Sequence, residues 1–230
     1  MKKNLIKLNF REKIWCNLFQ IKILRILLFY KLDRYKNKLP SLNKLRLNNK
    51  SIVVDIGANN GLITQYLFDK FSCTIHCFEP NPYCFEILKK IFKKNSKVKL
   101  YNFAVSNTLK SQKLYLSKDS ADITNMRYSE MPSLEKKKKN LSFKNYIIVR
   151  CLTFQKVMHK LKFIDFLKID IEGHEYKILP SIIKRIDKIG KVYCEMHGQN
   201  KSRSMGFDKD FKKWHKKLSR LKIKKIHYWY

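Results

Sequence analysis

The chain has 230 residues, which suits a single α/β domain with a short extension. Its formal net charge of +33 has two interpretations: the codon bias of an AT-rich genome, which the abundant lysine, isoleucine and asparagine favour as the main cause, or an anionic partner such as nucleic acid or an anionic membrane. The charge alone does not establish a nucleic-acid binder, because 42 lysines stand against 9 arginines and the recognition of bases relies on the bidentate arginine fork. The six cysteines form no CxxC pair, and the Cys73, His76 and Cys77 group lacks metal-binding spacing. Reduced, mostly buried thiols of a cytoplasmic protein are expected.

Residues 1–47 are predicted to form a basic, amphipathic helical extension that Pro40 ends. Charged residues interrupt any apolar core near Met1, so no secretory signal is expected. The run from Ile21 to Leu32 is too short and too charged to cross a bilayer. Two interpretations stay open: the helix lies on an anionic membrane surface, or its apolar face packs on the domain.

From residue 48 to residue 230 the chain alternates between strand and helix patterns. This alternation predicts a Rossmann-like α/β domain, a mostly parallel sheet with helices on both faces. A helix and a final strand complete the pattern near the C-terminus. The expected strands are 52–56, 73–79, 98–103, 164–170, 191–197 and 222–229, and the expected helices are 61–70, 82–94, 153–161, 174–186 and 207–219.

A polar stretch, residues 105–146, separates the third and fourth expected strands. Residues 113–116 have the pattern of a small extra strand. The lysine run from Glu135 to Asn140 is interpreted as a solvated loop rather than a binding patch. Such an insertion suits a lid over a ligand, although length alone does not establish one.

The segment Ser51-Ile-Val-Val-Asp-Ile-Gly-Ala-Asn-Asn-Gly61 combines a buried strand, a glycine turn and the start of a helix, which is typical of a nucleotide-binding corner. The turn does not match the G-x-G-x-x-G pattern of NAD sites. Asp55 precedes the turn, where a carboxylate would repel phosphate. Glu79, 24 residues later, ends the next strand, where an acid binds ribose hydroxyls. A phosphate-free, cationic nucleoside, S-adenosylmethionine, fits both acids.

Several segments together resemble the FkbM family of S-adenosylmethionine-dependent methyltransferases. The resemblance implies a class I methyltransferase fold and methyl transfer, often to a sugar or natural-product hydroxyl. It also implies that Glu79 takes the ribose hydroxyls and that Ala104 and Val105 lie near the adenine. The amino-acid end of the cofactor site would be shaped by Asp55, Gly57, Ala58, Asn59 and Gly61. The segments are VVDIGANNG (53–61), FEPNP (78–82), NFAVSN (102–107), LKIDIEGHE (167–175) and CEMH (194–197).

The chain departs from the family pattern at two places. The family usually has Leu-Asp-Asp before the fourth-strand motif, whereas this chain has Leu152-Thr-Phe-Gln155. Thr153 is still expected to cap the following helix. The chain also stops at Tyr230, where the family's sheet has one more strand, so an incomplete sheet edge is expected.

Candidate catalytic residues follow the fourth and fifth expected strands, whose carboxyl ends are where open α/β sheets bind ligands. An alcohol acceptor needs a base, and Asp170, Glu172, Glu195 and His197 are the candidates, with His197 as the expected base. Asp170 also borders the expected cofactor site. Glu172 has a competing interpretation as a cap of the following helix, as does Glu175, and His174 is expected to be a solvated residue of its first turn. Asp170, Glu195 and His197 are of metal-ligand type, but nothing fixes a geometry and no metal is predicted.

The leading hypothesis is an O-methyltransferase acting on a hydroxyl of a sugar, glycan or glycolipid, with peripheral contact to the inner face of a membrane through the N-terminal helix. An RNA methyltransferase and a non-catalytic membrane-associated domain are the alternatives. The segment Pro80-Asn-Pro-Tyr83 resembles the Asn-Pro-Pro-Tyr motif of amino-group methyltransferases. That motif belongs after the fourth strand, so this segment is interpreted as a turn with Pro82 near the first helical position.

Overall fold

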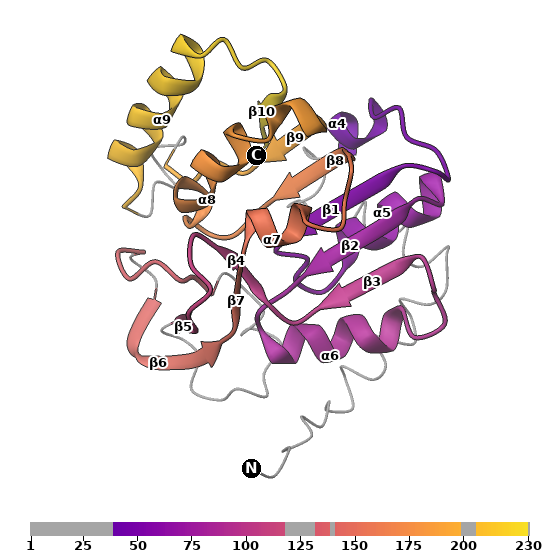
Figure 1. Cartoon of the computed structure of the whole chain (residues 1–230). Helices are drawn as coiled ribbons and strands as arrows, with labels where there is room; N and C mark the ends of the chain where they lie inside the picture. The colour runs from indigo at the N-terminus through magenta and orange to yellow at the C-terminus, as the bar shows by residue number, and fades with distance from the viewer. Residues whose placement is uncertain (1–38, 118–131, 139–140, 199–205, 230) are drawn as a thin grey trace.

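The computed structural model describes residues 39–117, 132–138, 141–198 and 206–229 (Figure 1). Its centre is a six-stranded sheet in the order β10-β9-β8-β1-β2-β3, and every neighbouring pair is parallel. This architecture confirms the predicted α/β fold. The strands are β1 (Ile52–Ile56), β2 (Thr74–Phe78), β3 (Val98–Tyr101), β8 (Ile164–Ile169), β9 (Ile189–Cys194) and β10 (Ile226–Tyr228).

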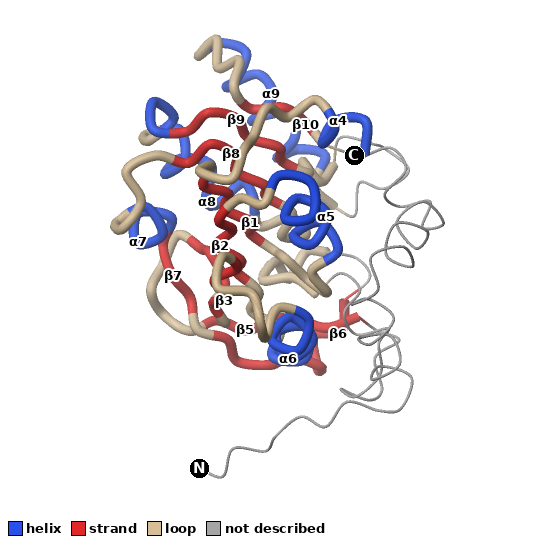
Figure 2. The backbone as a smooth tube through the Cα atoms, turned by 90° about the vertical axis from the view of Figure 1, so that its right-hand side faces the viewer, coloured by secondary structure: helices blue, strands red, loops and turns tan. Residues whose placement is uncertain are grey.

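Helices cover both faces of the sheet (Figure 2). Because successive strand residues point to opposite faces, Val54 and Leu167 pack with α7 and α8, whereas Val53 and Phe166 pack with α4 and α5. The two apolar layers hold the central strands β1 and β8 rigidly. The helices are α4 (Leu39–Asn43), α5 (Leu62–Phe71), α6 (Pro82–Ile91), α7 (Phe154–Met158), α8 (Glu175–Ile183) and α9 (Asp208–Arg220), with a 3-10 turn at Ile186–Lys188.

Two helix starts follow the predicted capping chemistry. Pro82 is the first residue of α6, and the side chain of Asn81 accepts a hydrogen bond from the backbone N–H of Tyr83 at 3.0 Å. The Thr153 hydroxyl caps α7 by accepting from the backbone N–H of Lys156 at 3.3 Å. Both predictions are confirmed.

The polar stretch 105–146 contains more strand than its composition predicts. The strand β5 (Gln112–Ser117) includes the predicted residues 113–116 and pairs antiparallel with β6 (Leu141–Val149), which the sequence analysis missed. A further pair joins β4 (Ala104–Ser106) to β7 (Cys151–Thr153) in parallel. The two pairs of strands share a small apolar cluster that includes Leu114 and Val149. Strand pairing and this cluster therefore give regular structure to a stretch whose other side chains are mostly polar.

The last part of the predicted N-terminal extension packs on the domain. Leu42 and Leu45 are buried in the core, and the Tyr193 hydroxyl donates to the carbonyl oxygen of Ser41 at 2.9 Å. Pro40 was expected to end a helix, but it lies in the first turn of α4, where its missing N–H costs nothing. The rest of the extension, residues 1–38, lies outside the described residues. Within the described part, no helix is long and apolar enough to cross a membrane.

The C-terminal elements complete one edge of the sheet. Residues 207–219 were expected to be helical, and α9 spans nearly the same range. The final strand was expected over 222–229, whereas β10 is only three residues long and pairs with β9 through Ile226 and Val192. Among the described residues the sheet therefore ends at β10.

Candidate active site

The predicted site residues lie at the carboxyl ends of neighbouring strands. β1 pairs with β2 on one side and with β8 on the other, so the order of strands along the chain reverses beside β1. Open α/β sheets bind their ligands at this kind of switch point. Asp55 lies in β1, Glu79 follows β2, Asp170 follows β8 and Glu195 follows β9. The fold therefore gathers residues that are far apart in the sequence.

The glycine turn after β1 has a strained backbone that only its sequence permits. Gly57 and Gly61 have φ angles of 80° and 83°, and Asn59 also has a positive φ, 51°. A Cβ atom on Gly57 would lie 1.9 Å from the backbone oxygen of Asp170. The N–H groups of Gly57 and Ala58 donate to the carbonyl oxygen of Phe78 at 2.9 and 3.2 Å. The turn is thus fixed between the ends of β2 and β8.

Asp55 is fully buried, and its carboxylate contacts side chains that hold the glycine turn. The hydroxyl of Thr64 donates to Asp55 Oδ2 at 2.6 Å, and Lys168 Nζ lies 3.1 Å from Asp55 Oδ1. The same ammonium donates to the carbonyl oxygen of Gly57 at 2.6 Å. Lys168 offsets the charge of Asp55, so the expected repulsion of a phosphate by Asp55 is not supported. Lys168 was missed by the sequence analysis, although a lysine inside the apolar strand β8 was a signal.

Glu79 joins the turns that follow β1 and β2. Its carboxylate accepts the backbone N–H groups of Asn59 and Asn81, each at 2.8 Å. Burial nevertheless raises the pKa of Glu79 to about 7. The side chain of Asn102 donates to the backbone oxygens of Glu79 and Pro80 at 2.9 and 3.1 Å. Glu79 is therefore a rigidly held carboxyl group whose oxygens still have lone pairs for further donors.

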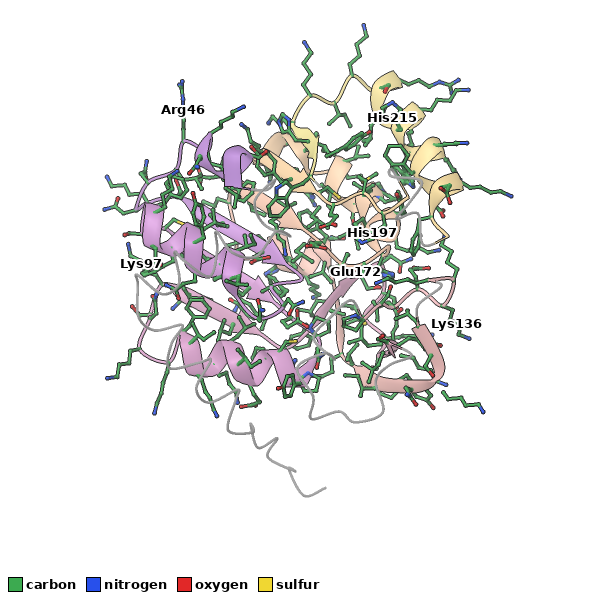
Figure 3. All side chains as sticks on the ribbon, turned by 180° about the vertical axis from the view of Figure 1, so that it is seen from behind. Arg46, Lys97, Lys136, Glu172, His197 and His215 are labelled. Atoms are coloured by element: carbon green, nitrogen blue, oxygen red, sulfur yellow. The ribbon has the colours of Figure 1, made fainter. Side chains whose placement is uncertain are left out.

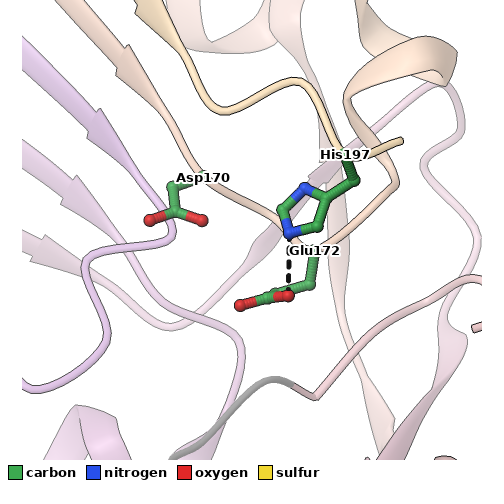
Figure 4. A group of neighbouring side chains, drawn as sticks. All are labelled: Asp170, Glu172 and His197. Atoms are coloured by element: carbon green, nitrogen blue, oxygen red, sulfur yellow. Dashed lines mark ion pairs between the residues drawn. The ribbon is translucent and has the colours of Figure 1, made fainter. Parts of the chain in front are cut away.

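Three predicted side chains meet beyond the ends of β8 and β9 (Figure 4). Asp170, Glu172 and His197 each offer an atom within 4.8 Å of the others. His197 Nε2 lies 3.0 Å from Glu172 Oε2, and His197 Nδ1 lies 3.1 Å from Glu175 Oε1. Burial lowers the pKa of His197, but the carboxylates of Glu175 and Glu172 outweigh burial and hold that pKa well above its usual value. The two carboxylates therefore favour the protonated form of the imidazole.

Glu172 has a backbone conformation that is unusual for a residue with a side chain. Its φ is 58°, and the next residue, Gly173, has a φ of 101° and packs against the ring of Phe207. The Ser133 hydroxyl donates to the backbone oxygen of Glu172 at 2.7 Å, and Lys138 Nζ lies 2.7 Å from Glu172 Oε2. Burial raises the pKa of Glu172, but the hydrogen bond from His197 and the charge of Lys138 bring it below its usual value.

Lys138 corrects the interpretation of the lysine run as a solvated loop. Its side chain is fully buried against Glu172, whereas Lys136 and Lys137 are exposed as expected. Lys136 points outward at the edge of the view in Figure 3, whereas the partly buried Glu172 and His197 lie toward its middle. A buried ammonium is tolerated because the carboxylate beside it compensates its charge. Composition identifies a lysine run but not which lysine faces inward.

His174 is also corrected, because it is buried rather than a solvated first-turn residue. Its Nε2 is hydrogen-bonded to the Ser106 hydroxyl at 2.9 Å, and its Nδ1 lies 2.8 Å from Glu135 Oε1. Helix α8 begins at the next residue, Glu175, whose Oε1 accepts the backbone N–H of Ile171 at 3.1 Å. Glu175 thus lies in the first turn of α8, but the start of the helix has no side-chain capping hydrogen bond, and the Glu175 carboxylate bonds to Ile171 outside the helix. Glu172 faces the site.

The remaining predicted residues lie at the margin of this group. Glu195 is partly exposed and its backbone N–H donates to the carbonyl oxygen of Ile169 at 2.9 Å. Its carboxylate is not part of the group formed by Asp170, Glu172 and His197. The metal-ligand set considered from the sequence contained Glu195, and in the structure Glu172 takes that place in the group. The side chains of Ala104 and Val105 are buried in apolar clusters. Their contact with an adenine stays a prediction.

The chain is similar to one family of methyltransferase domains and to several solved structures. A family model described as the methyltransferase FkbM domain matches residues 55–222. An FkbM methyltransferase structure from Methylobacillus flagellatus KT has 12% sequence identity and a TM-score of 0.45, with coverage of 74% of this chain and 38% of that chain. TrmK of M. capricolum, solved with S-adenosyl-homocysteine, has 15% identity and a TM-score of 0.32, with coverage of 67% and 49%. TYW2 of P. horikoshii, solved with MeSAdo, has 20% identity and a TM-score of 0.27, with coverage of 32% and 30%.

This chain spans less than half of the length of each of these three structures. No curated protein sequence matches it.

Proposed function

This chain belongs to the FkbM methyltransferase family, and from that premise we propose that it transfers a methyl group from S-adenosylmethionine to a hydroxyl group of a sugar, glycan or glycolipid. The family match over residues 55–222 confirms the family that the sequence motifs predicted. The observation that carries the proposal is the meeting of Asp170, Glu172 and His197 directly beside the Gly57 turn. Such a group combines a proton acceptor with polar partners for a hydroxyl-bearing acceptor.

The residues around the glycine turn suit the cofactor. Glu79 has the fixed position and the free lone pairs needed to accept the ribose hydroxyls. When bound, S-adenosylmethionine would supply an electrophilic methyl group on its sulfonium. In this proposal Gly57, Ala58, Asn59 and Gly61 shape the amino-acid end of the site.

The electrostatics of the group favour Asp170 as the proton acceptor. His197 was the expected base, and that role stays a prediction; we favour Asp170 because the carboxylates of Glu175 and Glu172 raise the pKa of His197 and so favour its doubly protonated form, which has no free lone pair. Asp170 follows β8 beside the glycine turn, and its side chain is 22% exposed, so it can reach an acceptor. The carboxylates of Glu172 and Glu195 then orient the acceptor, and His197 fixes Glu172 through its 3.0 Å ion pair.

The chemistry would balance as follows. A bound cofactor would supply the methyl carbon to the acceptor oxygen as its carbon–sulfur bond breaks, with the electron pair of that bond left on sulfur. The carboxylate of Asp170 would take the hydroxyl proton and release it to solvent. A positioned base of this kind contributes about 100- to 10,000-fold to the rate, and holding the acceptor in line with the methyl group contributes further.

The test is transfer of radiolabelled methyl groups into a glycan pool and, separately, into total RNA. We expect label in glycan, and we expect Asp170→Asn to lower kcat by about 100-fold or more while the Kd for the cofactor changes by less than about tenfold. Asp187→Asn, at an exposed acid in the 3-10 turn that follows α8, is the matched control and should retain activity. Label in RNA but not in glycan would overturn the substrate class. Cofactor binding without transfer to either pool would favour the non-catalytic alternative.

We further propose a cytoplasmic protein that contacts the inner face of an anionic membrane through residues 1–35 of the basic extension. The five described cysteines are free and buried, which suits a reducing compartment. The basic residues of the extension would each contribute about 1 kcal/mol near an anionic surface, screened by salt. Flotation with acidic liposomes at low and high salt is the test, and a chain that stays unbound at both would refute membrane contact.

A further inference from the structure

Lys138 carries a buried positive charge into the candidate site. Its side chain is fully buried, and its Nζ lies 2.7 Å from Glu172 Oε2. Its neighbours Lys136 and Lys137 are exposed, so the burial belongs to this one position and not to the lysine run. A lysine is almost never fully buried unless its charge is paired. The ion pair with Glu172 therefore compensates the buried charge of Lys138.

The segment that carries Lys138 is anchored beside the start of α8. The Ser133 hydroxyl donates to the backbone oxygen of Glu172 at 2.7 Å, and Ser133 also exchanges two backbone hydrogen bonds with Tyr115 in β5, at 2.8 and 3.0 Å. Glu135 pairs with the buried His174 at 2.8 Å. These contacts link residues 132–138 to β5 and to α8, so the position of the Lys138 ammonium is set by several independent bonds.

The ammonium lies against the carboxylate oxygen that a metal ion would use. Asp170, Glu172 and His197 are of metal-ligand type and their atoms lie within 4.8 Å of one another. Glu172 Oε2, however, already receives two cationic donors, Lys138 at 2.7 Å and His197 at 3.0 Å. A divalent cation on this oxygen would lie close to a buried, fixed positive charge, and their repulsion disfavours its binding.

We propose that Lys138 is a positioning residue that takes the place of a divalent cation at this site, fixing the Glu172 carboxylate so that methyl transfer proceeds without added metal. The inference rests on the proposed function for its kinetic part, because it assumes that Glu172 orients the hydroxyl acceptor. Its binding part, the exclusion of a metal ion, holds whatever the acceptor is.

The first experiment measures metal binding and needs no activity. The full chain is titrated with Mn²⁺ as wild type, Lys138→Met and Lys136→Met, the last being the matched control at an exposed neighbour. We expect wild type and Lys136→Met to bind Mn²⁺ at least about tenfold more weakly than Lys138→Met, because only Lys138→Met removes the buried ammonium that repels a cation at the Glu172 oxygen. Tight Mn²⁺ binding by wild type that is lost in Asp170→Asn would overturn the proposal.

The second experiment measures the His197 pKa by NMR titration. Removal of a cation from Glu172 leaves more negative charge beside the imidazole, so the His197 pKa should rise in Lys138→Met and stay unchanged in Lys136→Met. Lys138→Arg keeps the charge and should hold that pKa near its wild-type value. An unchanged His197 pKa in folded Lys138→Met, checked by thermal denaturation, would contradict the positioning role.

Kinetic measurements distinguish failure of the proposed role of Lys138 from failure of the proposed function. Wild-type transfer should be unaffected by a chelator, and Lys138→Met should lower kcat by about tenfold or more with an unchanged Kd for S-adenosylmethionine. Loss of wild-type activity on chelation would overturn the inference about Lys138 while leaving the proposed function intact. If wild type transfers methyl to no hydroxyl acceptor, the proposed function fails, and the Mn²⁺ and pKa results still decide the role of Lys138.

Discussion

The affinity for S-adenosylmethionine should fall as the pH drops through the pKa of Glu79. In the free protein burial raises that pKa to about 7, so the carboxyl group is largely ionised at about pH 8 and largely protonated at about pH 6. Ribose hydroxyls donate to the ionised form, so binding should lower the pKa and the ligand should prefer the higher pH. One pH unit on either side of the pKa changes the ionised fraction about tenfold, which corresponds to about 1.4 kcal/mol of binding free energy.

The assay is calorimetric titration of wild type, Glu79→Gln and Glu86→Gln with S-adenosylmethionine across this pH range. The amino group of the ligand titrates at a nearby pH, so the Glu79→Gln variant is essential: any pH dependence that it retains belongs to the ligand. Glu86, a partly exposed acid on α6 that pairs with Lys89, is the matched control and should behave as wild type. Equal pH dependence in wild type and Glu79→Gln would refute the assignment of Glu79 to the ribose.

Two further variants test the packing around the site. Thr64→Val removes the hydroxyl that donates to the buried Asp55 carboxylate at 2.6 Å, and should lower the free energy of unfolding by about 1–3 kcal/mol in urea denaturation; an unchanged value would show that this bond does not hold the turn. Leu42→Ala truncates a fully buried side chain and should cost about 2–5 kcal/mol in the same assay. A midpoint like that of wild type would mean that α4 does not pack on the domain.

The sheet and its helices could be predicted because their local patterns agree with their tertiary roles. The strands around Val54 and Leu167 are short apolar runs, and in the structure they are buried by helices on both faces. Thr153 caps a backbone group only three positions away and Pro82 begins α6, so the local sequence was enough to predict both, whereas the Asn81 cap was not predicted. The gathering of Asp170, Glu172 and His197 followed from their place after parallel strands.

The missed features depend on partners that are distant in the sequence. The strand β6 exists because it pairs with β5, and its exposed residues hide the apolar pattern of the buried ones. Lys138 resembles its lysine neighbours until Glu172, 34 residues later, is placed beside it. His174 is likewise buried by Ser106, 68 residues earlier in the chain. No local pattern reports a compensating charge or hydrogen bond across such separations.

The central place of β1 has a consequence for biosynthesis. β1 is made early and pairs first with β2, but its other edge is covered only by β8, and the bond from Ile52 to Asp165 joins residues 113 positions apart. At about 5–20 residues per second, a ribosome needs roughly 6–23 s to synthesise that interval. Throughout that time the nascent chain presents an uncovered apolar strand edge, which is the kind of surface that captures other chains. The yield of folded protein should therefore fall as the concentration of nascent chains rises. Chains that end before residue 164, where β8 begins, should aggregate.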